Sequence, residues 1–252
     1  MLQIKNVEKY YGSKNNVTKA LDRVSLDVAD GEFMAIMGAS GSGKTTLLNC
    51  ISTIDTVSAG EILLDGENIA DLPSGVLAKF RRERLGFVFQ DFNLLDTLTI
   101  EENIGIALAL NHEDANGVKA RVEEVAKKLG IADILEKFPY QVSGGQKQRT
   151  ACARAIVARQ SLLLADEPTG ALDSKASKNL LEIMEQMNRT MGATILMVTH
   201  DAYSASYAGR VLFLKDGHIF NELFRGERTR NIFYHEILNV LAVLGGDISD
   251  VI

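Results

Sequence analysis

The stretch "GASGSGKT", residues 38–45, decides the fold of this chain. It follows the apolar run "FMAIM" at 33–37, which predicts a buried strand, and it leads into "KTTLLNCIS", which predicts a helix. Glycines allow the backbone to wrap around a phosphate, and a helix N-terminus directs N–H groups and a positive dipole end toward an anion. The spacing G-x-x-x-x-G-K-[ST] therefore predicts a phosphate-binding loop for a nucleoside triphosphate.

The positions of this loop have separate expected roles. Lys44 is expected to reach the β- and γ-phosphates, and the hydroxyl of Thr45 is expected to ligate Mg²⁺. A plain glycine-rich turn is the alternative, but the strand before it and the helix after it favour the phosphate loop. With a nucleoside triphosphate as substrate and Mg²⁺ as cofactor, the predicted nucleotide-binding residues of the loop are Gly38, Ala39, Ser40, Gly41, Ser42, Gly43, Lys44, Thr45 and Thr46.

A second apolar run, "SLLLADEP" at 161–168, ends in two carboxylates. Asp166 closes the predicted strand, where a carboxylate can hold the Mg²⁺ shell. Glu167 follows it and is placed to act as the general base for the attacking water. Taken alone, the same residues could simply open a loop, with Pro168 stopping the strand. The phosphate loop elsewhere in the chain favours the metal and catalytic interpretation.

Polar side chains also follow two other predicted strands. Gln90 comes after "LGFVF" and His200 comes after "ATILMVT". Because ligands bind at the carboxyl edge of a parallel sheet, Gln90 is expected to contact the metal and the water, and His200 the γ-phosphate. A lone glutamine or histidine in a loop more often has a structural role, so these two assignments depend on the neighbouring motifs.

The stretch "VSGGQKQR" at 142–149 is a second glycine-rich helix start. Ser143 and Gln146 form an S-x-x-Q capping box, which by itself predicts only a well-capped helix. Capping gives no reason for Gly144 and Gly145, because glycine weakens a helix relative to alanine. The two glycines make sense where a ligand such as a phosphate must approach the helix N-terminus closely.

Composition limits the classes of function. The net charge of −6 gives no general attraction for nucleic acid, so nucleic-acid binding is not expected. The two cysteines, Cys50 and Cys152, form no CxxC pair and are expected to be reduced, structural thiols. We expect neither a membrane-spanning run nor a secretory signal, so the predicted location is cytoplasmic.

The remaining pattern predicts an α/β fold. Apolar strands alternate with helices such as 174–191, which indicates a parallel sheet with covered faces. Residues from about 91 to 160 are mostly helical in pattern, and "GRVLFLKDGHIFNEL" predicts a hairpin around Asp216-Gly217.

These motifs, in this order, resemble the ATPase of an ATP-binding cassette (ABC) transporter over residues 1 to about 225. The resemblance implies a RecA-like phosphate-loop core with a parallel sheet, an antiparallel β subdomain and a helical subdomain at about 91–160. The expected division is an ABC ATPase domain at 1–228 and a C-terminal helical tail at 229–252. Tyr11 resembles the aromatic residue that stacks on adenine; without the resemblance it would be read as a hairpin core tyrosine.

The resemblance also implies partners. Two such domains dimerise head to tail, so that Ser143, Gly144, Gly145 and Gln146 contact the ATP of the other subunit, and Asp173 in "GALD" resembles the residue that communicates across the dimer. The chain is therefore expected to form a homodimer, or to pair with a close relative, and to bind an integral-membrane permease on the inner face of the cell membrane. The basic run "FRRER" at 80–84 is either a solvated face or a contact with the permease or lipid headgroups.

Softer features narrow the resemblance to one branch. "GASG", "STIDTVSAG" at 52–60 and the tail beyond "KDGHIF" look most like the bacitracin and antimicrobial-peptide resistance subgroup, within the branch that also serves macrolide export and lipoprotein release. An exporter of the macrolide or lipoprotein-release type remains the alternative. A non-transport ABC ATPase of DNA repair or the ribosome is a second alternative, which the acidic charge disfavours. A regulatory module without turnover is a third, which Glu167 disfavours.

Overall fold

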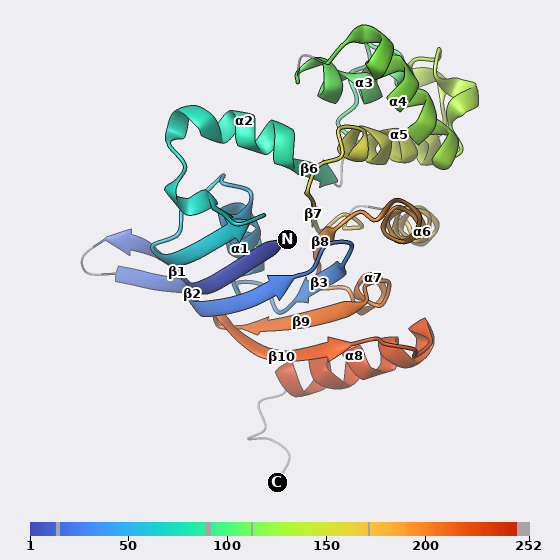
Figure 1. Ribbon diagram of the computed structural model, residues 1–252. Helices are drawn as coiled ribbons and strands as arrows, with labels where there is room; N and C mark the ends of the chain where they lie inside the picture. The colour runs from blue at the N-terminus through green and yellow to red at the C-terminus, as the bar shows by residue number, and fades with distance from the viewer. Residues whose placement is uncertain (14–15, 89–91, 112, 171, 246–252) are drawn as a thin grey trace. The chain divides into compact units, whose positions relative to one another are not determined.

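The computed structural model describes residues 1–13, 16–88, 92–111, 113–170 and 172–245. The chain divides into two compact units, the first made of Met1–Ser74 and Leu196–Ile252 and the second of Gly75–Ile195. Figure 1 traces the chain through both units.

The first unit contains an antiparallel sheet near the N-terminus. Its strands, in the order β2-β1-β4-β5, are β1 (Leu2–Ser13), β2 (Asn16–Val28), β4 (Ala59–Leu64) and β5 (Glu67–Asn68). Alternate residues of β1, among them Leu2 and Ile4, are buried, as expected for strands with one face on a core. The turn between β4 and β5 uses Asp65 and Gly66, both with positive φ, which is the turn chemistry that Asp-Gly predicts. A short 3₁₀ helix, η1 (Ile69–Asp71), follows β5.

A second group of strands in this unit carries the phosphate loop. Their order is β10-β9-β3-β8, with bounds β3 (Phe33–Met37), β8 (Ile195–Val198), β9 (Arg210–Lys215) and β10 (His218–Phe224). β3 pairs with β9 in parallel, and β10 closes an antiparallel hairpin with β9. All five residues of β3 are buried, which explains its unbroken apolar sequence. The helices of this unit are α1 (Lys44–Ile51), α7 (Ala202–Ala205) and α8 (Arg230–Gly245).

The second unit is mainly helical. Its elements are α2 (Ser74–Arg84), β6 (Leu85–Val88), α3 (Ile100–Ala109), α4 (Ala115–Lys128), η2 (Ala132–Ile134), η3 (Pro139–Gln141), α5 (Gly144–Ile156), β7 (Leu162–Asp166) and α6 (Ser174–Met191). The strands β6 and β7 pair in parallel. Gly86 of β6 lies so close to α5 that an added Cβ would fall 2.3 Å from the carbonyl oxygen of Ala155, so this strand needs a glycine.

The predicted α/β fold is confirmed, with parallel pairing in both units. The run "FMAIM" is β3, residues 174–191 are α6, and the Asp216-Gly217 hairpin joins β9 to β10. On α4 the apolar residues Val122, Val125 and Ala126 are buried, as expected for a helix with one face on a core. The division into a domain at 1–228 and a tail at 229–252 stays a prediction.

The last described helix, α8, packs within its own unit. Phe233, Ile237 and Leu244 on one side of this helix are buried, and the helix contacts α7. The guanidinium of Arg230 lies 4.1 Å from the ring centroid of Tyr207, an arrangement that adds a cation–π contact to this packing. The packing favours the ordinary role of an amphipathic surface helix, namely covering the core of its own domain.

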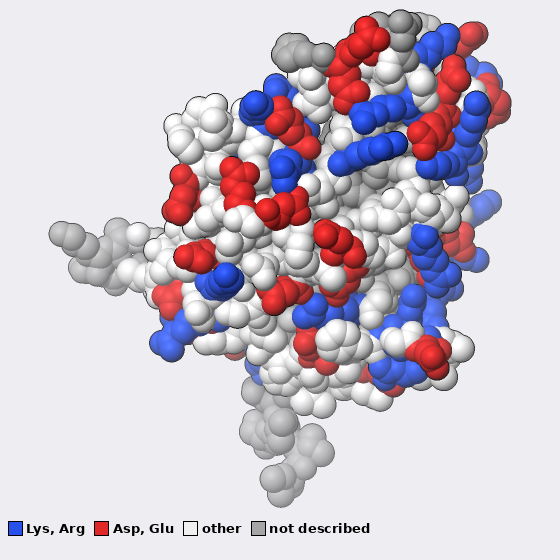
Figure 2. All heavy atoms as spheres, in the orientation of Figure 1, with Lys and Arg blue, Asp and Glu red and all other residues white. Residues whose placement is uncertain are grey.

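Charged side chains of both signs are interspersed over the face shown in Figure 2. Some of them form i,i+4 ion pairs on helices, such as Lys128 with Glu124 on α4 and Lys178 with Glu182 on α6. Pairs of this kind each stabilise a helix by only about 0.3–0.5 kcal/mol. The basic run at 80–84 forms the end of α2, where Arg82 donates to Asn111 and Arg84 to Ser161.

Candidate functional site

The phosphate loop lies between β3 and α1 in the first unit, and its shape depends on glycine. Gly38, Gly41 and Gly43 have φ values of 156°, 80° and 104°, which side chains with a Cβ rarely adopt. A Cβ on Gly38 would lie 2.3 Å from the carbonyl oxygen of Leu214, and one on Gly43 would lie 2.5 Å from that of Ala20. The neighbouring strands therefore enclose the loop and exclude larger residues from these two positions.

The groups inside this loop fit a triphosphate. The ammonium of Lys44 is buried and donates to the carbonyl oxygens of Gly38 and Ala39 at 2.9 and 2.8 Å, so the cation is held on the loop itself. The hydroxyl oxygen of Ser42 is buried and has no hydrogen-bond partner within the described residues. A buried hydroxyl normally finds a partner, so its orphaned state in the loop is what a missing phosphate oxygen would leave.

Tyr11 is connected to this loop by a contact with α1, the helix that follows the loop. Its ring is 41% exposed, so a flat ligand can reach it, and its hydroxyl donates to Asp55 at 2.6 Å. Burial raises the pKa of the Tyr11 hydroxyl, and the bond to Asp55 raises it further, while a hydrogen bond with the side chain of Thr46 acts in the opposite direction. Thr46 belongs to α1, so the predicted adenine contact and the phosphate loop belong to one connected structure.

His200 follows β8, the neighbour of β3 in the first unit. The backbone N–H of Thr199 donates to the carbonyl of Ile36 at 3.1 Å, which brings the ends of β8 and β3 together. Asp201 then caps α7 by accepting from the N–H groups of Tyr203 and Ser204. His200 is held between these two fixed points with its side chain exposed. The structure thus places His200 at the same strand edge as the phosphate loop.

The two carboxylates predicted to serve the metal and the water lie in the second unit, at the end of β7. Asp166 is the last residue of the strand and is half-buried. Glu167 has a φ of 44°, a left-handed conformation that costs energy in a residue with a Cβ. Its carbonyl accepts from the N–H of Gly170 at 3.0 Å, which holds the turn. Strained residues of this kind gather at functional sites.

The second glycine-rich segment forms the start of α5 in the second unit. Ser143 accepts from the N–H of Gln146, and the side chain of Gln146 accepts from the N–H of Ser143, which confirms the predicted capping box. A Cβ on Gly144 or Gly145 would meet no described atom within 4 Å outside the helix itself. In contrast to the phosphate loop, nothing in the described fold requires glycine at these two positions.

A cavity of about 550 Å³ opens beside this helix start. Ser143, Gly144, Gly145 and Gln146 line it together with Asp173, which caps the start of α6. Residues 143–146, predicted to contact the other subunit's ATP and called the signature from here on, therefore line one cavity with Asp173, predicted to communicate across the dimer. Sequence reasoning missed four other polar residues that line it, namely Gln148, Arg149, Lys175 and Asn179. The only sequence signal was their position on the first two turns of the two helices.

Gln90, predicted to contact the metal and the water, lies outside the described residues. Within them, no group of three or more His, Cys, Asp or Glu side chains is arranged to hold a metal ion. Thr45 in the first unit has an exposed hydroxyl and Asp166 in the second unit has a strand-end carboxylate. Each is an oxygen ligand of the kind that suits Mg²⁺, which is usually bound through one or two protein groups plus substrate phosphates. A cage made of protein side chains alone is not needed for this ion.

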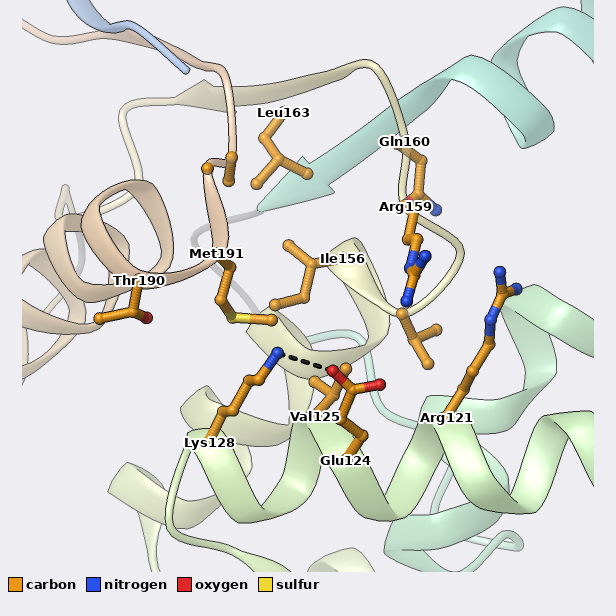
Figure 3. A pocket seen from close by; sticks show the side chains of 13 residues that line it. Arg121, Glu124, Val125, Lys128, Ile156, Arg159, Gln160, Leu163, Thr190 and Met191 are labelled. Carbon is orange, nitrogen blue, oxygen red and sulfur yellow. Dashed lines mark hydrogen bonds and ion pairs between the residues drawn. The ribbon is translucent and has the colours of Figure 1, made fainter. Parts of the chain in front are cut away.

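A separate cavity of about 450 Å³ lies in the second unit. Figure 3 shows Arg121, Arg159 and Gln160 on one side of it and Thr190 and Met191 on the other, with the ion pair between Glu124 and Lys128 at its edge. No residue predicted as functional from the sequence lines it.

Comparisons with known proteins agree with this geometry. Residues 21–170 match the family described as "ABC transporter". The chain is 54% identical to the ABC transporter ATP-binding protein YxdL of Bacillus subtilis, over 99% of this chain and 96% of the relative. It is 46% identical to the bacitracin export ATP-binding protein BceA of Halalkalibacterium halodurans, over 99% of both chains.

A solved structure is also similar. The dimeric, post-hydrolysis structure of the ATP-binding cassette MJ0796 bound to ADP and phosphate superposes with a TM-score of 0.74 at 38% identity, covering 89% of this chain and 98% of that one. Among the described residues of the present chain, no helix has both the length and the apolar character needed to cross a membrane. The match to the family, the relatives and the fold confirms the resemblance seen in the motifs: this chain belongs to the ABC transporter ATP-binding family and is an ATPase of that family.

Proposed function

We propose that the chain binds ATP with Mg²⁺ on its phosphate loop, hydrolyses it in a dimer, and powers a permease that exports or detaches peptide antibiotics. The observation that carries this proposal is the contrast between the two glycine-rich helix starts. One is enclosed by its own fold, while the other exposes bare glycines beside a polar cavity, as a surface that receives a second subunit's nucleotide would.

The chain's own residues divide the reaction among them. Lys44 holds the terminal phosphates, and the backbone N–H groups from Gly38 to Thr46 surround them. Glu167 accepts a proton from the attacking water, and His200 donates a hydrogen bond to the γ-phosphate. When bound, Mg²⁺ neutralises the charge that develops on the phosphates. Thr45, Asp166 and Gln90 are the residues proposed to hold it.

The second subunit contributes its signature. Ser143, Gly144, Gly145 and Gln146 bind the γ-phosphate of the nucleotide on the other copy, and Asp173 communicates between the two sites. This arrangement explains the capping box and the two glycines together, because the helix stays formed while its N-terminus stays open to an anion. The homodimer binds the permease at the inner face of the cell membrane.

The similarity to the bacitracin export protein supports peptide antibiotics as the transported class. The similarity to YxdL extends over nearly the whole of both chains, as expected for a separate ATPase subunit of the same kind. The transported molecule itself is chosen by the permease, so the substrate class is tested through that partner.

The test uses Glu167→Gln with ATP and Mg²⁺. Hydrolysis is expected to fall by about 10²- to 10⁴-fold, the usual contribution of general base catalysis, while ATP binding persists and dimers accumulate in light scattering. Glu182→Gln, a change at an exposed carboxylate of α6, is the matched control and should hydrolyse ATP normally. A wild-type rate in Glu167→Gln would contradict the general-base role.

The same variant identifies the partner. Tagged Glu167→Gln held in the ATP-bound dimer is used to capture permease from native membranes, followed by mass spectrometry. A large multi-span permease with a substantial extracellular domain would support peptide-antibiotic resistance. A four-span permease with a periplasmic domain would move the chain to the macrolide or lipoprotein-release branch, and recovery of no membrane protein would contradict the transport role.

A further inference from the structure

Two adjacent tyrosines of β1, Tyr10 and Tyr11, are about equally exposed, at 38% and 41%. Each is held by a carboxylate and lies near a lysine. Tyr10 donates to Glu8 and has the ammonium of Lys19 5.3 Å from its ring centroid. Exposure and local chemistry alone therefore do not separate the two rings, and the difference lies in what each is attached to.

Tyr11 is attached to the helix behind the phosphate loop. Its hydroxyl donates to Asp55 at 2.6 Å, and the backbone N–H of Asp55 donates to the carbonyl of Asn49 on α1 at 3.1 Å. Tyr10 is attached instead to neighbours on its own sheet, since Glu8 is on β1 and Lys19 on β2. A ring that must keep a fixed distance from the phosphates needs the first kind of attachment.

Lys9 is the third member of this attachment. Its ammonium is buried, forms an ion pair with Asp55, donates to the carbonyl of Thr56 at 2.6 Å, and lies 4.9 Å from the centroid of the Tyr11 ring. A buried ammonium needs such partners, so the contacts fix its position. Burial alone would raise the pKa of the Asp55 carboxyl, but the hydrogen bonds from Lys9, Tyr11 and the Thr56 backbone outweigh it and the pKa is lowered. The carboxylate thus stays charged between the ammonium and the hydroxyl.

We propose that Lys9 and Asp55 are positioning residues that hold the Tyr11 ring in place over the nucleotide base. They act through Tyr11 and touch no phosphate. The inference rests on the proposed binding of ATP at the phosphate loop, and it adds that affinity for the base depends on a tether between residues 46 positions apart in the sequence. The tether sets how strongly the site prefers a nucleoside triphosphate over a bare triphosphate.

The test compares ATP with inorganic tripolyphosphate, both with Mg²⁺, by calorimetry on the full chain. Tyr11→Phe and Asp55→Asn are each expected to weaken ATP binding about threefold to tenfold, the effect of one hydrogen bond, and to leave tripolyphosphate binding unchanged. Because both changes disturb the hydrogen bond between Tyr11 and Asp55, the double variant is expected to bind ATP no more weakly than Asp55→Asn alone. KM for ATP rises correspondingly, with kcat nearly unchanged.

The neighbouring tyrosine supplies the matched control. Tyr10→Phe removes a similar hydroxyl from a similar carboxylate and is expected to leave ATP binding unchanged. Additive effects in the double variant, an equal loss of tripolyphosphate binding, or wild-type ATP affinity in Asp55→Asn would each overturn the inference.

Tyr11→Ala separates this inference from the proposed function. If ATP binding is weakened in Tyr11→Ala but unchanged in Asp55→Asn, the positioning role of Lys9 and Asp55 is contradicted while the base contact of Tyr11 stands. Unchanged ATP binding in Tyr11→Ala would remove the base contact itself, and with it both the tether and that part of the proposed site. Lys44→Ala is measured alongside. A loss of ATP binding in this variant shows that the phosphate loop binds the nucleotide, whatever the result for the base contact.

Discussion

The phosphate loop and the signature segment (residues 143–146) both place glycines at the start of a helix, but glycine is needed there for different reasons. Gly38 and Gly43 have positive φ, and a Cβ at either would collide with the backbone of a neighbouring strand. Gly144 and Gly145 have ordinary helical backbone, and a Cβ at either would point into open space. The first pair is needed by the fold that contains it, whereas the second pair has no such internal reason. A glycine that its own fold does not need indicates a ligand or partner that approaches from outside.

The comparison also extends to the helices that follow. α1 begins at Lys44, and its N-cap Gly43 has no side chain to cap it, so the phosphates themselves can satisfy its first N–H groups. α5 begins with a complete capping box, so its helix forms without a ligand. The start of α1 thus depends on a bound anion for its hydrogen bonds, whereas the start of α5 forms its own hydrogen bonds without one.

The largest expected effect comes from removing the cation of the first loop. Lys44→Ala should weaken ATP binding by about a hundredfold, since the variant loses charge-assisted hydrogen bonds to the phosphates. The measurement is calorimetric titration with ATP and Mg²⁺. Lys175→Ala, in the signature cavity, is the matched control, because that cavity serves the other subunit and a single chain should bind ATP as before. Unchanged affinity in Lys44→Ala would contradict the phosphate-loop assignment.

The phosphate loop, the capping box and the strand ends could be predicted because their determinants are local. "FMAIM" is buried on all sides, Asp-Gly fixes a turn, and Ser143 finds Gln146 three residues away. The tether of Tyr11 could not be predicted, because Asp55 meets Lys9 only after β1 has paired in its sheet and α1 has packed beside it. For the same reason the sequence did not predict Arg149, Lys175 and Asn179, which line one cavity only when α5 and α6 pack together. Spacing in the sequence reports contacts along one element but not contacts that packing creates.

A pair of glycine substitutions tests the comparison directly. Gly43→Ala should lower the free energy of unfolding by roughly 1–3 kcal/mol, the cost of a left-handed conformation for a residue with a Cβ, with the collision at Ala20 adding to it. Gly144→Ala should leave stability unchanged or raise it by up to about 1 kcal/mol, because alanine is the better helix residue. Both are measured by urea unfolding monitored by circular dichroism.

The second half of this prediction concerns activity. Gly144→Ala should bind ATP normally as a single chain but lose the dimers that form in the Glu167→Gln background. A Gly144→Ala variant that still dimerises would show that the open glycines serve something other than a second subunit's nucleotide. A Gly43→Ala variant of wild-type stability would show that the enclosed loop relaxes more easily than its contacts indicate.

The smallest expected effect uses the one thiol that each helix carries, Cys50 on α1 and Cys152 on α5. Burial raises the pKa of Cys50 to about 11 and that of Cys152 to about 12, from an ordinary value of 9.0. Both thiols therefore stay neutral in the folded chain at pH 8 and at pH 10, and the thiolate is the reactive form. Alkylation of the native chain should consequently be slower than that of an exposed thiol, by at least about a hundredfold at pH 8 and at least about tenfold at pH 10.

The sign of the stability effect follows from the same shifts. Because the folded state favours the neutral thiol, the stabilisation is complete below pH 9 and is lost as the pH rises from there toward 11 and 12. Cys50 has the smaller pKa shift and should be the first thiol to react as the pH is raised. Labelling on α1 should therefore precede labelling on α5. Mass spectrometry of iodoacetamide-treated protein assigns each site, and Cys50→Ser and Cys152→Ser separate the two contributions. Rapid labelling of Cys152 in the native chain at pH 8 would mean that α5 opens readily, and the capped helix would then not be the more stable of the two.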